Sequence, residues 1–398
     1  MPIPIPFPLH LPIPLYPNLP LTNQPPPLLP QRKTTNNALS ILTAIHKADS
    51  IPVYIGSPHA LTRPPLPAPT DIHGDSGLDG TSLLPKPKVS ARTSPPAIDA
   101  AYAALKACKP GTAWVVATGA FTNIAKLFMT YPDLIGHIRG LSLMGGALGG
   151  RFTDAVLGVV DGVPRAGNWT QYAEFNVLAD PEAAAFIFGN KELAAKTTLI
   201  PLDVSHLVLT TSTVRDLLLY GREGVEKRHP MGGSPSPTTP TPSPEGARLQ
   251  GKTPLRTMLV ELLLFFAKTY AEVFSITEGP PLHDPLAVAA VLTGLSETHP
   301  HLKEHEIPFI EHDPSITEPG LAQPERYEVS VVTEGSYEDA LLRGARTGQI
   351  VAKKLPPGTP GVRIPRRLDV ALFWEVLEEC VQRADEAVAR AEEGGKAE

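Results

Sequence analysis

Cysteine is scarce in this sequence: its 398 residues include only Cys108 and Cys380. Two cysteines cannot form a disulfide framework, and neither has the C-x-x-C or C-x-x-H spacing typical of redox or zinc sites. A reducing compartment, the cytoplasm, is therefore expected. A surplus of charge of one sign is also lacking, because 35 Lys and Arg stand against 41 Asp and Glu. Without a basic surplus, nucleic acid is not expected as a partner.

The first 48 residues contain no Asp or Glu, and the first carboxylate of the chain is that of Asp49. Proline is abundant there instead, with twelve prolines in the first thirty residues. Each internal proline removes an amide donor and clashes with the preceding helical turn. This apolar stretch is therefore not expected to form a signal peptide or a membrane helix, and no membrane association is expected. We expect residues 1–35 to be extended or disordered.

Short apolar runs alternate with helical patterns over residues 36–392. The expected strands cover residues 51–56, 113–117, 138–144, 198–202, 327–332 and 349–353. The expected helices cover residues 37–45, 97–108, 122–130, 255–275 and 368–392, and one more begins at Asp180-Pro181, an N-cap followed by a proline in the first turn. This alternation predicts an α/β fold with an open, mostly parallel sheet and helices on both faces.

Two segments, residues 151–167 and 229–254, interrupt this alternation and are expected to be insertions in the domain. The second is rich in Pro, Ser and Thr, a composition typical of a solvated linker. In open parallel sheets, ligands bind beyond the carboxyl ends of the strands. Motifs on the loops after strands are therefore the first candidates for a site.

Residues 71–80 contain three carboxylates, His73 and three glycines. Glycine permits backbone conformations that let a loop approach a ligand closely. A polar surface loop explains the same composition, and composition alone does not separate the two.

Asn168, Glu174 and Asn176 lie just before the helix expected at Asp180. On an extended backbone Glu174 and Asn176 share one face, so both can point at one ligand. A carboxylate beside carboxamides supplies the acceptors and donors that the vicinal hydroxyls of a sugar require. The alternative is a loop whose polar side chains stabilise its own turns.

The sequence His283-Asp284-Pro285 precedes another helical pattern. Asp284 before a proline suits a helix N-cap, and that structural role explains it without any function. A carboxylate beside an imidazole at the start of a helix can also hold a metal and donate a proton. The spacing does not decide between these interpretations.

Thr118-Gly119 and Met144-Gly145-Gly146 follow two expected strands, where backbone groups can reach a ligand. Residues 145–150 do not fit the G-x-G-x-x-G pattern, because position 147 is alanine. A dinucleotide-dependent oxidoreductase is therefore disfavoured.

Taken together and in this order, these segments resemble the inosine-uridine preferring nucleoside hydrolase family. The resemblance extends from about residue 35 to residue 385 and rests on Asn37-Ala38-Leu39-Ser40, Ile72-His73-Gly74-Asp75-Ser76-Gly77-Leu78, Ala117-Thr118-Gly119-Ala120-Phe121-Thr122-Asn123, Met144-Gly145-Gly146, Gly167-Asn168 with Ala173-Glu174-Phe175-Asn176, Asp180-Pro181-Glu182-Ala183-Ala184, Pro201-Leu202-Asp203-Val204 and His283-Asp284-Pro285-Leu286-Ala287.

The resemblance implies hydrolysis of the N-glycosidic bond of purine and pyrimidine ribonucleosides such as inosine and uridine, which gives ribose and a free base. In family members a Ca²⁺ ion holds the ribose hydroxyls and a water. Carried over by position, Asp284 and the backbone carbonyl of Thr118 are expected calcium ligands. A homodimer or homotetramer is expected, since family members commonly form one.

The same resemblance implies roles at the two ends of the substrate. The ribose is expected to contact Met144, Asn168, Glu174 and Asn176. The base pocket is expected to include His73, and His283 is expected to protonate the leaving base near neutral pH. Loss of the base leaves an oxocarbenium-like sugar, so negative charge near the ring and an acid near the base fit the reaction.

The start of the chain departs from the family pattern. Members begin with a strand and a D-x-D-x-x-x-D-D cluster that supplies calcium ligands and the general base, whereas residues 1–48 contain no Asp or Glu. The first strand and most of the metal site are therefore expected to be missing. We expect weak calcium binding and little or no turnover, and a non-catalytic protein that binds a nucleoside or ribose is the alternative.

Overall fold

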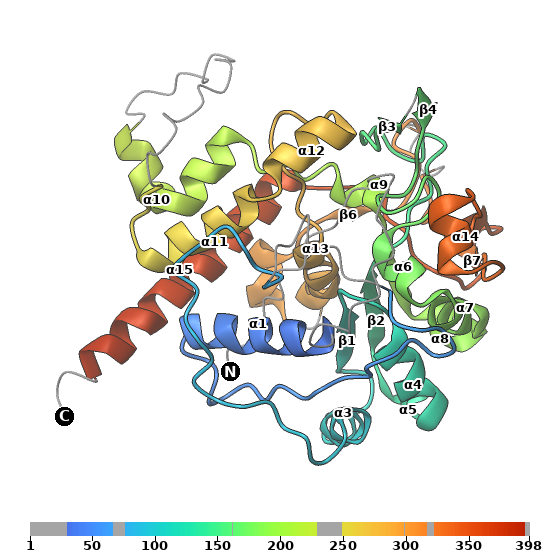
Figure 1. Cartoon of the computed structure of the whole chain (residues 1–398), viewed down its shortest axis with the longest axis horizontal. Helices are drawn as coiled ribbons and strands as arrows, with labels where there is room; N and C mark the ends of the chain where they lie inside the picture. The colour runs from blue at the N-terminus through green and yellow to red at the C-terminus, as the bar shows by residue number, and fades with distance from the viewer. Residues whose placement is uncertain are drawn as a thin grey trace.

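A three-stranded parallel sheet lies at the centre of the molecule (Figure 1). The computed structural model describes residues 30–66, 76–160, 162–228, 249–297, 299–316 and 322–394. In the sheet, the strands follow the order β1 (Trp114–Ala117), β2 (Gly140–Met144) and β5 (Thr197–Ile200). β2 and β5 are buried along their whole length, as expected for parallel strands that are covered on both faces.

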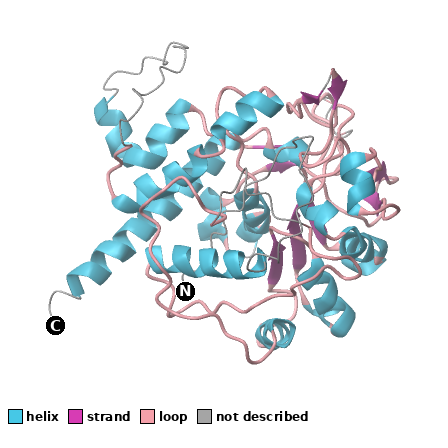
Figure 2. Cartoon of the chain, in the orientation of Figure 1, coloured by secondary structure: helices cyan, strands magenta, loops and turns pink. Residues whose placement is uncertain are grey.

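Helices cover both faces of this sheet (Figure 2). On one face, α13 (Asp284–Ala289) packs against all three strands. The other face shares an apolar core with α4 (Thr122–Thr130), α5 (Leu134–His137), α7 (Pro181–Gly189) and α8 (Lys191–Ala195). The predicted α/β fold, an open parallel sheet between helices, is confirmed.

Two expectations near the start of the chain are wrong. α1 (Pro30–Ala44) begins inside the range 1–35 that was expected to be extended, and Pro30 is its first residue, where a missing amide costs nothing. Residues 51–56 form no strand and pair only where Tyr54 bridges Arg92. A strand needs a partner along its length, and this segment has one at a single position. Residues 1–29 lie outside the described residues.

Four helices from the second half of the chain form a helical layer at one side of the sheet (Figure 1). This layer consists of α10 (Ser212–Arg228), α11 (Pro254–Leu264), α12 (Ala267–Phe274) and the long α15 (Val370–Gly394). The single helix predicted over residues 255–275 is therefore two helices. The chain between them exposes Phe265 and buries Phe266, so the change of direction keeps the apolar side of α12 in the core.

A buried arginine joins three of these helices. Arg256 of α11 is fully buried, and its Nη2 donates to Glu378 of α15 over 2.8 Å while its Nε donates to Asp385 of the same helix. Its Nη1 donates to the carbonyl of Leu218 in α10 over 2.8 Å. Gly221 kinks α10 with a φ of 71°, and a Cβ there would lie 3.3 Å from the Glu378 carboxylate. This ion cluster holds α15 against α10 and α11.

The remaining strands pair antiparallel in twos: β3 (Val159–Val160) with β4 (Val163–Pro164), β6 (Phe309–Ile310) with β9 (Arg367–Leu368), and β7 (Tyr327–Val331) with β8 (Ile350–Lys354). The remaining helices are α3 (Ala97–Lys106), α6 (Phe175–Ala179), α9 (Leu202–Ser205), α14 (Tyr337–Leu342) and 3₁₀ turns at Ala290–Leu292, Leu295–Glu297 and Pro300–His305. The hairpin β3–β4 occupies the first expected insertion. Most of the second, residues 229–248, lies outside the described part of the chain. None of the described helices combines the length and the apolarity needed to cross a bilayer.

Candidate nucleoside site

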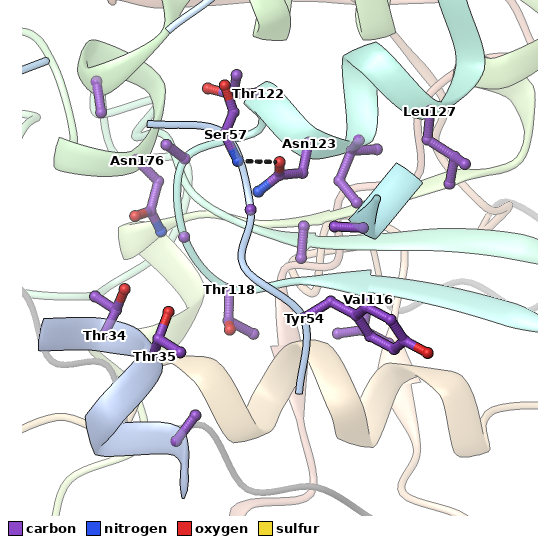
Figure 3. A pocket seen from close by; sticks show the side chains of 18 of the residues that line it. Thr34, Thr35, Tyr54, Ser57, Val116, Thr118, Thr122, Asn123, Leu127 and Asn176 are labelled. Atoms are coloured by element: carbon purple, nitrogen blue, oxygen red, sulfur yellow. Dashed lines mark hydrogen bonds between the residues drawn. The ribbon is translucent and has the colours of Figure 1, made fainter. Parts of the chain in front are cut away.

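A cavity of about 910 Å³ opens at the carboxyl end of β1. Six of the eight residues proposed from the sequence line it: Thr118, Met144, Glu174, Asn176, His283 and Asp284. Figure 3 shows Thr34 and Thr35 of α1 on the same side of the cavity as Thr118. The segment that contains Ser57 lies across from them, and it is held there because its Ser57 amide donates a hydrogen bond to Asn123 Oδ1 over 2.9 Å. The structure thus brings together residues that are up to 166 positions apart in the sequence, from 118 to 284.

One long side of this cavity is formed by β1 itself. Among the described residues β1 is one of the two edge strands of the sheet and has β2 as its partner. Alternate residues of a strand turn their amides and carbonyls to opposite sides, so part of the β1 backbone faces the cavity. Within these described ranges, the edge of β1 that lies away from β2 has no strand partner.

Two of the proposed residues are placed differently. Asn168 is fully buried but is not among the residues that line the cavity. Its Oδ1 accepts from the amide of Phe175 over 3.0 Å, and its Nδ2 has no hydrogen-bond partner within the described part of the chain. His73 lies outside the described residues.

Glu174 is the N-cap of α6, and its backbone is followed by a helix rather than by the expected extended segment. Its carboxylate accepts hydrogen bonds from the amides of Gly146 (2.8 Å), Asn176 (2.9 Å) and Val177 (3.2 Å). Asn176 donates from Nδ2 to the carbonyl of Met144 over 3.0 Å. Burial raises the pKa of Glu174 to about 7. The two side chains therefore stabilise their own turn and also line the cavity.

Asp203 holds the far end of the glycine-rich loop that Glu174 contacts. Its carboxylate accepts from the amides of Leu148 (2.8 Å) and Gly149 (2.9 Å). Burial raises the pKa of Asp203 to about 6. The loop of residues 145–150 is thus held between two buried carboxyl groups.

His283 is fully buried at the N-cap position of α13, and Asp284 is the first residue of that helix. His283, not Asp284, holds the N-cap position and forms no side-chain cap hydrogen bond, so the N-cap interpretation of Asp284 does not hold. The Nε2 of His283 lies 2.8 Å from the hydroxyl of Tyr270, and its Nδ1 lies 2.7 Å from the hydroxyl of Ser205. Burial lowers the pKa of His283 well below its usual value. The ring is therefore neutral at neutral pH.

Three buried residues near the site were missed from the sequence: His206 and Tyr270, which contact His283, and Arg165, which contacts the ring of Phe274 behind Tyr270. His206 directly follows α9, and its ring centroid lies 5.5 Å from that of His283. Its Nδ1 lies 2.7 Å from the carbonyl of Val156, so Nδ1 carries the proton, because a carbonyl only accepts. In the sequence, Tyr270 is one apolar position of an amphipathic helix and Arg165 lies in an expected insertion, so neither has a signal of its own.

We expect His206→Asn to become more stable relative to the wild type as the pH falls. Burial lowers the pKa of His206 to about 4, whereas it is 6.5 in the unfolded chain. The stability that the neutral ring contributes is present above pH 6.5 and is lost as the pH falls toward 4. An asparagine keeps a donor for Val156 and does not titrate. Urea unfolding at pH 7.5 and pH 5 should show a relative gain of about 2 kcal/mol for the variant at pH 5. If the difference in unfolding free energy between the variant and the wild type were the same at both pH values, the lowered pKa of the buried His206 ring would be contradicted.

Comparison with known proteins agrees with this geometry. The family model described as inosine-uridine preferring nucleoside hydrolase matches residues 29–375. The chain belongs to this family. It is 33% identical over 358 residues to the uridine nucleosidase of Saccharomyces cerevisiae, which covers 89% of this chain and 86% of the yeast protein. Hydrolysis of ribonucleosides is the activity that the family and its named relatives share.

Other nucleoside hydrolases match over shorter stretches or by fold alone. The pyrimidine-specific ribonucleoside hydrolase RihA of Shewanella woodyi is 32% identical over 262 residues, which are 65% of this chain and 66% of that protein. The solved structure of a purine-preferring ribonucleoside hydrolase from Gardnerella vaginalis covers 89% of this chain and 86% of its own, with a TM-score of 0.58 and 21% identity. A plant nucleoside hydrolase has the same TM-score and identity. These two structures support the fold.

The donor set of the cavity does not fit a calcium ion. Ca²⁺ takes six to eight oxygen ligands. Within the described ranges, no group of three or more His, Cys, Asp or Glu side chains could hold a metal. Of the expected ligands, the described chain supplies the Asp284 carboxylate and the Thr118 carbonyl. A nucleoside hydrolase with these two ligands lacks most of the coordination that the resemblance implies.

Proposed function

We propose that the polar end of the cavity binds the ribose of a purine or pyrimidine ribonucleoside, such as inosine or uridine. The observation that carries the proposal is the convergence of Met144, Glu174, Asn176 and Asp284 on one cavity. Glu174 and Asn176 are rigid, because each is tied to backbone groups of the surrounding loops. Rigid acceptors and donors hold vicinal hydroxyls without a cost of ordering at the time of binding.

The base is proposed to leave beside the pair Tyr270 and His283. Burial raises the pKa of Tyr270 well above its usual value, so the phenol keeps its proton. A neutral His283 bonds to the Tyr270 hydroxyl at Nε2 and to the Ser205 hydroxyl at Nδ1, so a proton can move along this chain of three groups while the ring donates at one nitrogen and accepts at the other. Proton delivery through this pair does not require a charged histidine. His73 remains a proposed wall of the base pocket, and Asn168 a proposed ribose contact.

We further propose that turnover is weak and that calcium binds weakly. Residues 1–48 have no carboxylate to serve as calcium ligand or as general base. Asp284 and Thr118 alone do not replace a full coordination shell. These observations also favour a second candidate function, a protein that binds nucleosides without hydrolysing them. A cytoplasmic location and a homodimer or homotetramer complete the proposal.

Calorimetry with uridine and inosine, with and without Ca²⁺, tests the ribose site. We expect the wild type to bind nucleoside, and we expect Asn176→Ala to weaken binding about tenfold or more, because a buried amide that faces the sugar is lost. Asn36→Ala is the matched control, since Asn36 is exposed on α1 and does not line the cavity. Equal affinities of the two variants would place the sugar elsewhere. Release of free base by the wild type separates hydrolysis from binding alone.

A further inference from the structure

A buried positive charge lies behind the pair Tyr270 and His283. Arg165 is 4% exposed, and no carboxylate of the described residues forms an ion pair with it. Its Nε donates to the carbonyl of Gly167 over 2.6 Å and its Nη2 to that of Thr170 over 3.3 Å, while Nη1 has no hydrogen-bond partner among the described residues. Burial lowers its pKa to about 10, so the guanidinium is still charged at neutral pH. A buried charge without an opposite partner is costly.

A series of ring contacts connects this charge to the cavity. The central carbon of the Arg165 guanidinium lies 5.0 Å from the centre of the Phe274 ring. Phe274 stacks on Tyr270, with ring centroids 5.1 Å apart. The Tyr270 hydroxyl in turn lies 2.8 Å from Nε2 of His283, and His283 lines the cavity. The cation is thus two rings away from the residue that is proposed to face the base.

We propose that Arg165 stabilises the negative charge that develops on the departing base. This assignment rests on the proposed function. As the C1′–N bond breaks, its electron pair goes to the base nitrogen, the oxygen of water bonds to C1′, and one proton of that water ends on the base. Until a proton arrives, the base carries negative charge. A fixed cation in dry surroundings acts strongly on such a charge and needs no rearrangement during the reaction.

Arg165 acts here as a positioning residue, through its field rather than by contact with substrate. The class of substrate it favours is a nucleoside whose base leaves as an anion, such as a uracil nucleoside. A purely structural role is the competing explanation, because Arg165 also ties the carbonyls of Gly167 and Thr170 together. Arg165→Lys keeps the charge, whereas Arg165→Met removes it at similar length, so the two variants separate the roles.

The first measurement is the affinity for uracil and for 5-nitrouracil, an acidic uracil, at a pH where 5-nitrouracil is an anion. Calorimetry should show that the wild type prefers the anion by about tenfold, that Arg165→Lys keeps much of this preference, and that Arg165→Met loses it. Thermal melts of all three proteins show whether each is folded. A wild type without preference for the anion, or a Met variant that retains it, overturns the assignment.

The second measurement is turnover of two ribosides. Arg165→Met should lower kcat/KM for uridine by up to about tenfold and kcat/KM for 4-nitrophenyl riboside much less, because nitrophenolate delocalises its own negative charge and depends less on an external cation. Equal losses on both substrates mean a structural role and overturn the assignment. If the wild type binds neither uridine nor inosine, the proposed function itself fails and this assignment falls with it. If it binds them but shows no preference for the anion, only the assignment fails.

Discussion

Replacing residues 1–29 by a strand that ends in D-x-D-x-x-x-D-D should raise calcium-dependent hydrolysis of uridine by about 1,000-fold or more. The segment to be replaced contains no acid, and the described cavity supplies two of the expected calcium ligands, Asp284 and Thr118. The added aspartates would complete a coordination shell of oxygens and supply a general base, which are large effects in catalysis by metal-activated water. No strand of the described residues pairs with β1 on the side away from β2, so the added strand has a place to pair beside the cavity of about 910 Å³.

The rate of base release from uridine with and without a calcium chelator measures this effect. The matched control is the same graft with asparagine in place of each aspartate, which restores the strand but not the charge. We expect the control to gain stability without gaining rate. Calcium-dependent turnover by the ungrafted chain at the rate of the graft would contradict the prediction, as would a graft that folds and stays inactive.

Arg256→Ala should lower the free energy of unfolding by about 3–5 kcal/mol. Arg256 is fully buried, and its loss leaves the Asp385 carboxylate buried without a counter-charge and Glu378 with only the half-exposed Arg222, 3.7 Å away, in the described part of the chain. It also removes the donor for the carbonyl of Leu218, so α10, α11 and α15 lose their common contact. Denaturant unfolding followed by circular dichroism gives the value.

Arg390→Ala is the control for this change on the same helix. Arg390 is exposed and pairs with Glu386 at 3.8 Å, so its removal should cost less than about 0.5 kcal/mol. Similar losses for the two variants would show that the buried cluster contributes no more than a surface pair. A further variant replaces Arg256 by Met and both Glu378 and Asp385 by apolar residues. If this variant is more stable than the wild type, the ion cluster specifies how α10, α11 and α15 pack rather than adding to the stability of the fold.

The central sheet was predictable from the sequence because its strands are short apolar runs that end at Thr118-Gly119 and Met144-Gly145. Burial on both faces leaves that pattern in any sequence. The strand expected at 51–56 has the same pattern but only a bridge at Tyr54, because pairing depends on a neighbour that the pattern does not encode. The division of residues 255–275 at Phe265 was also hidden, since both halves continue one amphipathic pattern.

The candidate site was predictable where the motif residues lie at strand ends, as for Thr118 and Met144. The partners of these residues were not. Tyr270 and Arg165 reach the neighbourhood of His283 only through the packing of α12 and of the loop before Asn168. The neutral state of His283 follows from complete burial, which a sequence does not show.

The loop of residues 145–150 has a consequence for how the cavity responds to a sugar. At one end of the loop, an oxygen of Glu174 accepts a hydrogen bond from the amide of Gly146. At the other end, the Asp203 carboxylate accepts hydrogen bonds from the amides of Leu148 and Gly149. Both ends of the loop are therefore tied to buried carboxyl groups before any ligand is present. A sugar that enters the cavity thus meets a backbone wall whose shape is already set, and the glycines of this loop do not have to be ordered when the sugar binds.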